Sequence, residues 1–97
     1  MYPVSSELYR QVAAFLAQVV GGRSYFSGSV EGETEGAAWR LTASVIVYRR
    51  RVSQPEGTAE PISDLVPVWW EFHTFAADGE VPNDFSFGEI RDLFRSL

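Results

Sequence analysis

The only histidine of the 97-residue chain, His73, lies in the stretch VPVWWEFHTF, which runs from residue 66 to residue 75. Glu71 precedes it by two residues, so an extended strand places both side chains on one face. If an earlier strand pairs alongside, Ser44 lies across from His73, and the residue types of a serine–histidine–carboxylate triad come together. A flat sheet face offers no oxyanion hole, however, so we expect His73 to be a strand residue and the chain to be no enzyme.

Metal and cofactor sites find equally little support in the residue types. The chain has no cysteine, and a single histidine would need carboxylates to complete a coordination shell. Glu31, Glu33 and Glu35 alternate around a turn, but their spacing is not that of a calcium-binding EF-hand loop. The stretch GGRSYFSG lacks the spacing of a phosphate-binding loop. We therefore expect no catalytic, metal or cofactor-binding residues.

Every basic residue is an arginine, and Arg49 to Arg51 form the only basic cluster. One interpretation is a phosphate-binding patch in which Tyr48 and Trp69 stack on bases. The interpretation we favour is that these arginines pair with the carboxylates that follow them, which are Glu56, Glu60 and Asp64. The formal net charge of −5 also repels nucleic-acid phosphates, so nucleic acid is an unlikely partner.

These side chains must be positioned by secondary structure, which begins with a helix predicted over residues 6–20. The apolar residues at helical spacing are Leu8, Val12, Phe15, Leu16 and Val19. Ser5 or Ser6 can cap the start, because a serine oxygen accepts a hydrogen bond from a free N–H of the first turn. Gly21 and Gly22 supply the left-handed stop.

Three strands are predicted next, over residues 23–31, 38–52 and 66–75. In the first, Phe26 and Val30 share one face. In the longest, the inward residues are Trp39, Leu41, Ala43, Val45 and Val47. Glu31 to Gly36 form the turn between these two strands, which should pair as a hairpin.

The third strand carries Val68, Trp70 and Phe72 on its apolar side. Antiparallel pairing with the long strand aligns the two apolar sides if Val47 faces Trp70 and Val45 faces Phe72. Pro67 must then lie at the strand's start or on its edge, because proline has no N–H for the ladder.

Residues 53–64 contain two prolines, a glycine and three carboxylates, which predicts a mobile surface loop. A second helix is predicted after it, near the end of the chain. Ser86 as N-cap and Glu89 three residues later match a capping box. The apolar stripe of this helix is Ile90, Leu93, Phe94 and Leu97.

The predicted fold is one two-layer α+β domain spanning residues 1–97, with the order helix, three-stranded antiparallel meander, helix (αβββα). Both helices pack on one face of the sheet. The chain resembles double-stranded-RNA-binding domains in this order of elements alone. The last helix of those domains begins with lysines, whereas NDFSFGE is acidic here and would repel phosphate. No family is identified.

The opposite sheet face is our candidate for binding a partner, and its residues are Tyr48, Arg50, Trp69, Glu71, His73 and Phe75. In the predicted register Tyr48 lies opposite Trp69. Arg50 is then near enough to Trp69 to stack on its ring. Large aromatic side chains seldom stay in contiguous exposed patches without a use. The alternative is that a tail, the long loop or a tilted helix covers this face.

We therefore predict a small non-enzymatic binding or accessory protein of microbial type that uses this face for self-association, as a homodimer, or for contact with another protein. The alternative is an acidic inhibitor or nucleic-acid mimic that binds a basic partner. A small enzyme or ligand-binding domain with a site near His73 comes third. Residues 1–6 resemble no signal peptide and apolar runs are short, which predicts a cytoplasmic location and no membrane contact.

Overall fold

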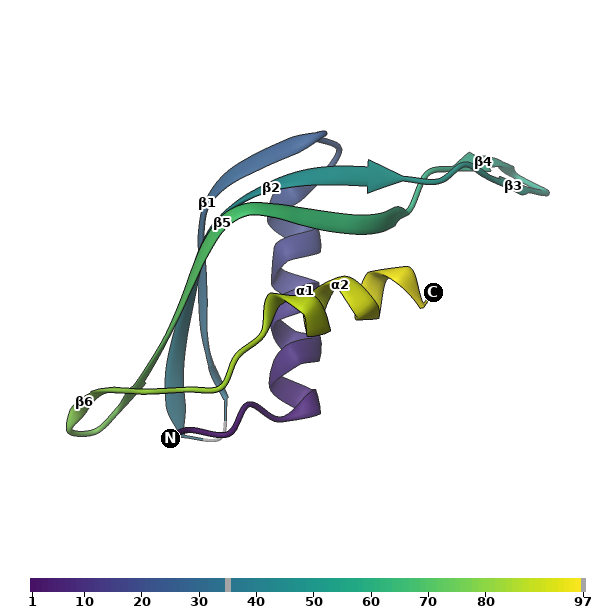
Figure 1. Cartoon of the computed structure of the whole chain (residues 1–97). Helices are drawn as coiled ribbons and strands as arrows, with labels where there is room; N and C mark the ends of the chain where they lie inside the picture. Colours follow the sequence, from purple (N-terminus) through teal and green to yellow (C-terminus); the bar gives the residue numbers. More distant parts are fainter. Residues whose placement is uncertain (35, 97) are drawn as a thin grey trace.

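The computed structural model describes residues 1–34 and 36–96. These residues form two helices and an antiparallel sheet, so the fold is α+β (Figure 1). The elements in chain order are α1 (Ser6–Val20), β1 (Tyr25–Thr34), β2 (Ala37–Arg49), β3 (Val52–Gln54), β4 (Gly57–Ala59), β5 (Ile62–Ala76), β6 (Gly79–Val81) and α2 (Phe87–Arg95). The predicted αβββα order is not confirmed, because six strands are present among the described residues.

Helix α1 has the predicted bounds. The hydroxyl oxygen of Ser5 accepts a hydrogen bond from the N–H of Leu8 at 3.1 Å, which caps the first turn. Gly21 ends the helix with a φ of +55°, a backbone conformation that glycine adopts without strain. Val20 is fully buried, whereas Val19, predicted to be inward, is 39% exposed. The reason is helical spacing, because Val20 lies four residues after the buried Leu16.

The main sheet has the strand order β1-β2-β5-β6, and all neighbouring strands are antiparallel. Strands β1 and β2 form the predicted hairpin, with Tyr25 opposite Ile46 and Thr34 opposite Ala37. The alternation predicted for the long strand is confirmed, since all five inward residues of β2 are buried. The predicted turn is shorter in the structure because β1 continues to Thr34; Glu35 and Leu97 lie outside the described residues.

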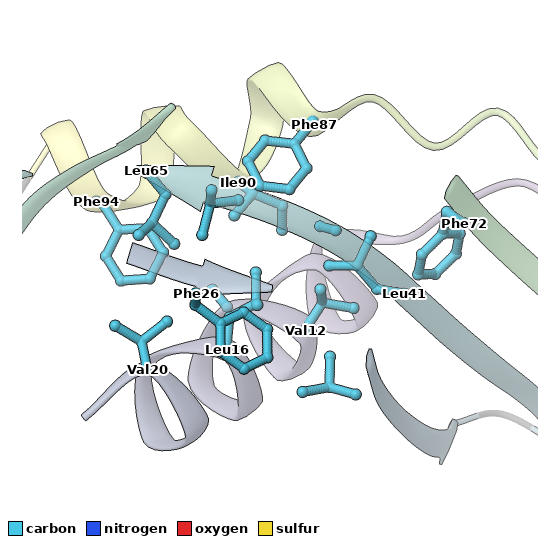
Figure 2. Close-up of a cluster of buried hydrophobic side chains, with 14 of the residues drawn as sticks. Val12, Leu16, Val20, Phe26, Leu41, Leu65, Phe72, Phe87, Ile90 and Phe94 are labelled. Carbon is cyan, nitrogen blue, oxygen red and sulfur yellow. The ribbon is translucent and has the colours of Figure 1, made fainter. Parts of the chain in front are cut away.

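Both helices lie on the concave side of the curved sheet (Figure 1). Their buried side chains meet the inward side chains of the strands in one core, seen in Figure 2, where Val12 and Leu16 of α1 lie near Leu41 and Ile90. The molecule measures 51 × 23 × 18 Å, with a radius of gyration of 14.5 Å. A compact chain of this length has a radius of about 12.5 Å. The molecule is therefore elongated, with β6 at one end and β3 and β4 at the other (Figure 1).

The register between β2 and β5 differs from the predicted one because β5 contains a bulge. Ser44 faces Trp69 and Val45 faces Pro67, which leaves Val68 as an extra residue between them. One extra residue reverses the face on which the following side chains lie. Residues with even numbers from Trp70 to Thr74 face inward beyond the bulge, whereas Leu65 and Pro67 face inward before it. The predicted pairs Val47–Trp70 and Val45–Phe72 are therefore wrong.

The two tryptophans predicted to face inward, Trp39 and Trp70, differ in burial. Trp70 pairs with the buried Ala43, but it lies at the margin of the core and is 37% exposed against the rings of Phe85 and Phe87. Trp39 is the buried tryptophan, with 2% exposure, and its indole N–H donates to the side-chain oxygen of Gln11 at 2.7 Å.

Gly32 lies opposite Trp39 in the β1–β2 ladder. A Cβ atom at Gly32 would lie only 2.9 Å from the indole ring of Trp39. The absence of a side chain at this position therefore makes room for the largest residue of the core.

Residues 50–61, within which most of the mobile loop was predicted, contain the short hairpin of β3 and β4, with Val52 opposite Ala59. This hairpin, the β3–β4 arm, projects past the end of the main sheet (Figure 1). Its side chains are mostly exposed, and its mobility stays a prediction. At its base the guanidinium of Arg49 donates to the carbonyl oxygens of Gly21, Arg23 and Glu60, which ties the arm to the end of α1.

Helix α2 begins without the predicted capping box. Ser86 is the N-cap residue, but its hydroxyl makes no capping hydrogen bond. In a capping box the side chain of Glu89 would accept a hydrogen bond from the backbone N–H of Ser86. Here this N–H donates to the hydroxyl of Tyr9 at 3.0 Å instead. Arg91 of α2 makes a two-pronged ion pair with Asp64 of β5, at 3.0 and 2.8 Å. Both contacts fix α2 against its neighbours.

The start of the chain lies alongside the segment that precedes α2. The N–H of Tyr2 donates to the carbonyl of Pro82 at 2.7 Å, and the N–H of Asp84 donates to the carbonyl of Tyr2 at 3.3 Å. The N–H of Val4 donates to the carboxylate of Asp84 at 2.8 Å. These bonds join two segments that are about as far apart in the sequence as the chain allows.

Candidate interaction surface

The convex face of the main sheet, called here the outer face, carries the side chains that alternate with the core. Neither helix covers it, since both lie on the concave side (Figure 1). The register arranges its residues in rows across β1, β2 and β5. The rows are Glu33–Ala38–Phe75, Glu31–Arg40–His73, Ser29–Thr42–Glu71, Ser27–Ser44–Trp69 and Tyr25–Ile46–Val66.

Hydroxyl groups occupy the middle of the outer face. The hydroxyls of Ser27 and Ser44 are 2.8 Å apart, and those of Ser29 and Thr42 are also 2.8 Å apart. These hydrogen bonds run directly across the β1–β2 ladder, where cross-strand pairs stabilise a sheet. Because the hydroxyls bond to each other in pairs, they form a polar strip across the middle of the face.

An aromatic patch lies on the half of the outer face nearer the β3–β4 arm. Its members are Tyr25, Ile46, Tyr48 and Trp69, and their exposed fractions are 51, 38, 51 and 49%. Tyr25 and Ile46 are paired directly, and Tyr48 follows Ile46 by two residues on the same face of β2. Val68, at the bulge beside Trp69, is 65% exposed. Apolar surface is therefore concentrated on one half of the face.

A charged patch lies on the other half, and its members are Glu31, Arg40, Glu71, His73 and Glu80. The imidazole of His73 lies between two carboxylates, with Nδ1 at 2.8 Å from Glu80 Oε2 and Nε2 at 3.3 Å from Glu71 Oε2. The hydrogen bonds to Glu80 and then Glu71 raise the pKa of His73 above its usual value. The patch thus favours a protonated histidine.

Phe75 lies beside the charged patch and lines an open hollow at the tip of the sheet, together with Glu31 and Arg40 of that patch. Its ring stacks on His73 with centroids 6.3 Å apart, and the guanidinium of Arg40 lies 5.4 Å from its centroid. The hollow has a volume of about 390 Å³ and is lined by Glu31, Gly32, Glu33, Ala38, Trp39, Arg40 and Phe75. It is shallow and open, so it resembles a surface depression more than an enclosed ligand site.

The structure places five of the six predicted partner-binding residues on the two halves of the outer face and the sixth, Arg50, on neither. Glu71, His73 and Phe75 come together on the charged half, and Tyr48 and Trp69 belong to the aromatic half. Arg50 is exposed and lies beyond the end of β2, where its N–H donates to the carbonyl of Pro61.

Two predicted contacts within that set are wrong. Tyr48 faces Asp64 and not Trp69, because the bulge shifts the register of β5. For the same reason the predicted stacking of Arg50 on Trp69 loses its geometric basis.

The serine–histidine–glutamate set considered from the sequence does not assemble. Ser44 faces Trp69, whereas His73 faces Arg40. Among the described residues, no group of three histidine, cysteine or acidic side chains is arranged to hold a metal ion. Glu31 and Glu33, considered from the sequence for calcium, belong to no such group among the described residues. The third residue considered, Glu35, lies outside the described part of the chain.

The predicted partners of the arginine cluster are not the observed ones. Arg49 bonds to backbone carbonyls, including that of Glu60, and not to a carboxylate. Asp64 pairs with Arg91 of α2 instead. Arg50 and Arg51 are exposed, and their side chains make no ion pair with another described residue.

Glu80 is a member of the charged patch that sequence reasoning missed. It lies on β6, a three-residue strand that pairs with the end of β5, with Phe75 opposite Glu80. The signal was present in the pair Asp78-Gly79, since an Asp-Gly pair after an alternating strand is typical of a tight hairpin turn. Gly79 has a φ of +120°, which requires glycine.

No protein-family model, curated protein or solved structure matches this chain. The site therefore has to be interpreted from its own geometry. Within the two described ranges, neither helix is long and apolar enough to cross a membrane.

Proposed function

We propose that the chain is a small non-enzymatic, cytoplasmic protein-binding domain that contacts a second copy of itself or another protein through the aromatic patch. The observation that carries this proposal is the clustering of Tyr25, Ile46, Tyr48 and Trp69 on a sheet face that neither helix covers. Contiguous apolar surface of this kind marks interaction sites in proteins that are otherwise polar outside.

The shape of the surface supports a protein partner over a small molecule. Small-molecule sites are concave and bury most of their ligand. The aromatic patch lies instead on the convex face of the sheet, beside the strip of paired hydroxyls. Tyrosine and tryptophan are also the residue types enriched at protein interfaces, because each combines a large apolar ring with a polar group.

A second candidate is the acidic inhibitor, which the charged patch favours. Glu31 of β1, Glu71 of β5 and Glu80 of β6 lie on the same half of the outer face. Carboxylates gathered from three strands would attract a basic partner and steer its approach. Arg40 and a protonated His73 within the same patch weaken this attraction, so we rank it second.

A charge in the centre of the aromatic patch tests the leading proposal. Trp69→Glu should abolish association while leaving the circular dichroism spectrum near that of the wild type, because Trp69 is half exposed. Val19→Glu is a matched control, since Val19 is an exposed apolar residue on α1 and not a member of the aromatic patch. Light scattering from low to high micromolar concentration measures the mass. Loss of the fold in Trp69→Glu would contradict the proposal and favour a covered patch.

The identity of the partner is tested by a photo-crosslinking amino acid placed at Tyr48, which is 51% exposed. An adduct of twice the chain's mass indicates self-association, and an adduct of another mass indicates a different protein. The same crosslinker at Glu7 of α1 is the control for chance encounters. Absence of any adduct specific to position 48, both in the purified protein and in the native cell, would count against the aromatic patch as an interface.

A further inference from the structure

We infer that His73 is a proton-controlled latch, in which the protonated ring ties Glu80 of β6 to the outer face beside Glu71 and loss of the proton releases β6. The inference does not require the outer face to have a partner. It rests on the position of the ring between two carboxylates that come from different strands.

The two ring nitrogens have to be considered together. Nδ1 lies 2.8 Å from Glu80 and Nε2 lies 3.3 Å from Glu71. A neutral imidazole carries one N–H, so one nitrogen would present a lone pair to a carboxylate oxygen, which also carries lone pairs. Only the protonated ring donates on both sides. The arrangement in the structure therefore suits the charged form, and a neutral ring can keep at most one of the two contacts.

Strand β6 is the element that the latch holds. It has three residues and pairs with β5 through Val81, Glu80 and Gly79. A second side-chain hydrogen bond joins β5 to β6. In it the hydroxyl of Thr74 donates to the carbonyl oxygen of Val81 at 2.7 Å. So short a strand at the tip of an elongated sheet has few contacts to lose, and such segments open most readily.

The other charges that face His73 come from the neighbouring strands. Arg40 of β2 is its cross-strand partner, and Glu31 of β1 is the partner of Arg40. The two carboxylates in contact favour the protonated ring, whereas Arg40 opposes it, and Glu31 offsets Arg40. Both helices lie on the opposite side of the sheet and contribute no charge to this group.

The sign of the pH dependence follows from the direction of the pKa. Hydrogen bonds to Glu80 and Glu71 raise the pKa of His73 above 6.5 in the folded chain. A group with a raised folded pKa contributes all of its stabilisation below its unfolded pKa, and this stabilisation is lost as pH rises through the folded pKa. The latch is therefore closed in mildly acidic solution and opens above pH 6.5.

The experiment uses the imidazole NMR signal, which is unambiguous because the chain has a single histidine. The wild-type ring should titrate above pH 6.5. Glu80→Gln should lower this midpoint more than Glu71→Gln, because Glu80 is the nearer partner. Glu56→Gln on the β3–β4 arm removes the same charge far from His73, and it should leave the midpoint unchanged.

The second readout is hydrogen exchange at those β6 amides that bond to β5, expressed as protection relative to a free peptide. Protection should fall about two- to fivefold as the ring loses its proton, which is the size expected for an exposed ion pair. His73→Gln should show the lower protection at every pH. A ring that titrates while β6 protection stays constant would overturn the latch. So would a midpoint that Glu80→Gln fails to move.

Discussion

Individual side chains in this protein differ in whether they hold the fold together or face outward. Trp39 is 2% exposed and packs between the rings of Phe15 and Phe72. Trp69 and Trp70 are adjacent in the sequence, and both are more than a third exposed. Aromatic character alone therefore does not separate core from surface here. The deciding factor is how far the core encloses each residue, because Trp69 faces outward and Trp70 lies at the margin of the core.

Replacing each tryptophan by alanine separates these roles. Trp39→Ala should lower the free energy of unfolding by about 3–5 kcal/mol, because it empties a large core volume and leaves Gln11 without its indole partner. Trp70→Ala should cost about 1–2 kcal/mol, since it loses only edge contacts with Phe85 and Phe87. Urea unfolding followed by circular dichroism measures both. If Trp70→Ala lost more stability than Trp39→Ala, Trp70 and not Trp39 would be the central tryptophan of the core.

At the scale of elements, the bulge in β5 decides which of its side chains are buried. Leu65 faces inward before Val68 and Phe72 faces inward after it, although seven positions separate them and strict alternation would put them on opposite faces. A second shift between Tyr48 and Arg49 brings Ile62 opposite Arg49. Strand β5 thus keeps an apolar inner side by breaking its own alternation.

Deletion of Val68 tests whether stability depends on the presence of the extra residue or on its side chain. Val68→Ser should change stability by less than about 0.5 kcal/mol, because the side chain is 65% exposed. Deleting Val68 should abolish cooperative unfolding, since either Leu65 or Phe72 would be turned toward solvent. Thermal melts and amide NMR spectra distinguish the two variants. A deletion variant with a wild-type melt would show that the register is not fixed by the bulge.

The ion pair between Asp64 and Arg91 joins two elements, β5 and α2, and should respond to acid. The hydrogen bond from Arg91 lowers the pKa of Asp64 below its usual value of 3.8. A lowered folded pKa contributes stability above the unfolded pKa, and this contribution is lost as pH falls through the folded one. Asp64→Asn should therefore be less stable than the wild type near neutral pH, by about 1 kcal/mol. The difference should shrink below about pH 4.

Melting curves of both proteins between neutral pH and pH 2 provide this measurement. Asp92→Asn is a suitable control for an exposed ion pair, because Asp92 lies on the same helix and pairs with Arg95 while its side chain is 65% exposed. A stability difference for Asp64→Asn that is independent of pH would mean that packing, and not charge, makes this contact important.

The elements that sequence reasoning predicted are those whose pattern is local. Helix α1 follows from the spacing of Leu8, Val12 and Leu16, and β2 follows from strict alternation. The register of β5 was not predictable in this way. The bulge depends on how the side chains of β5 fit those of β2, and the composition of β5 alone does not indicate it. The β3–β4 arm was hidden by prolines and a glycine, which are equally typical of an irregular loop.

The candidate site was predicted in part for the same reason. Membership of the outer face for Tyr48, Trp69, Glu71, His73 and Phe75 depends only on alternation within each strand, and the structure places them there or at its edge. Which of them are neighbours depends on register, and that prediction failed for Tyr48 and Trp69. The position of Glu80 beside His73 depends on a three-residue strand, which is too short for a periodic signal.

At the scale of the whole molecule, the outer face is divided into an aromatic half and a charged half along a body 51 Å long. The two proposed modes of binding use different halves, so they respond differently to ionic strength. Apolar burial is insensitive to charge screening and is strengthened by many salts, whereas steering by carboxylates is screened within about 10 Å at 0.1 M salt.

Sedimentation at low and high salt therefore discriminates between the two halves. Association through Tyr25, Ile46, Tyr48 and Trp69 should change little with salt. Binding of a basic protein through Glu31, Glu71 and Glu80 should weaken steeply, and Glu71→Gln should weaken it further at low salt. Dissociation of a self-associated form at high salt would contradict the role of the aromatic patch and favour an electrostatic interface.

The bonds that Tyr2 and Val4 make with residues 82–84 have a consequence for how the chain reaches its structure. Val4 and Asp84 are separated by 80 positions, so this contact cannot form until nearly all of the described chain is available. During synthesis α1 and the β1–β2 hairpin can form from local contacts, but the first residues stay undocked until residue 84 has left the ribosome. Contacts between such distant segments require closing long loops, which slows folding. The complete fold should therefore form only after residue 84 has been synthesised, and more slowly than a helical bundle of the same size.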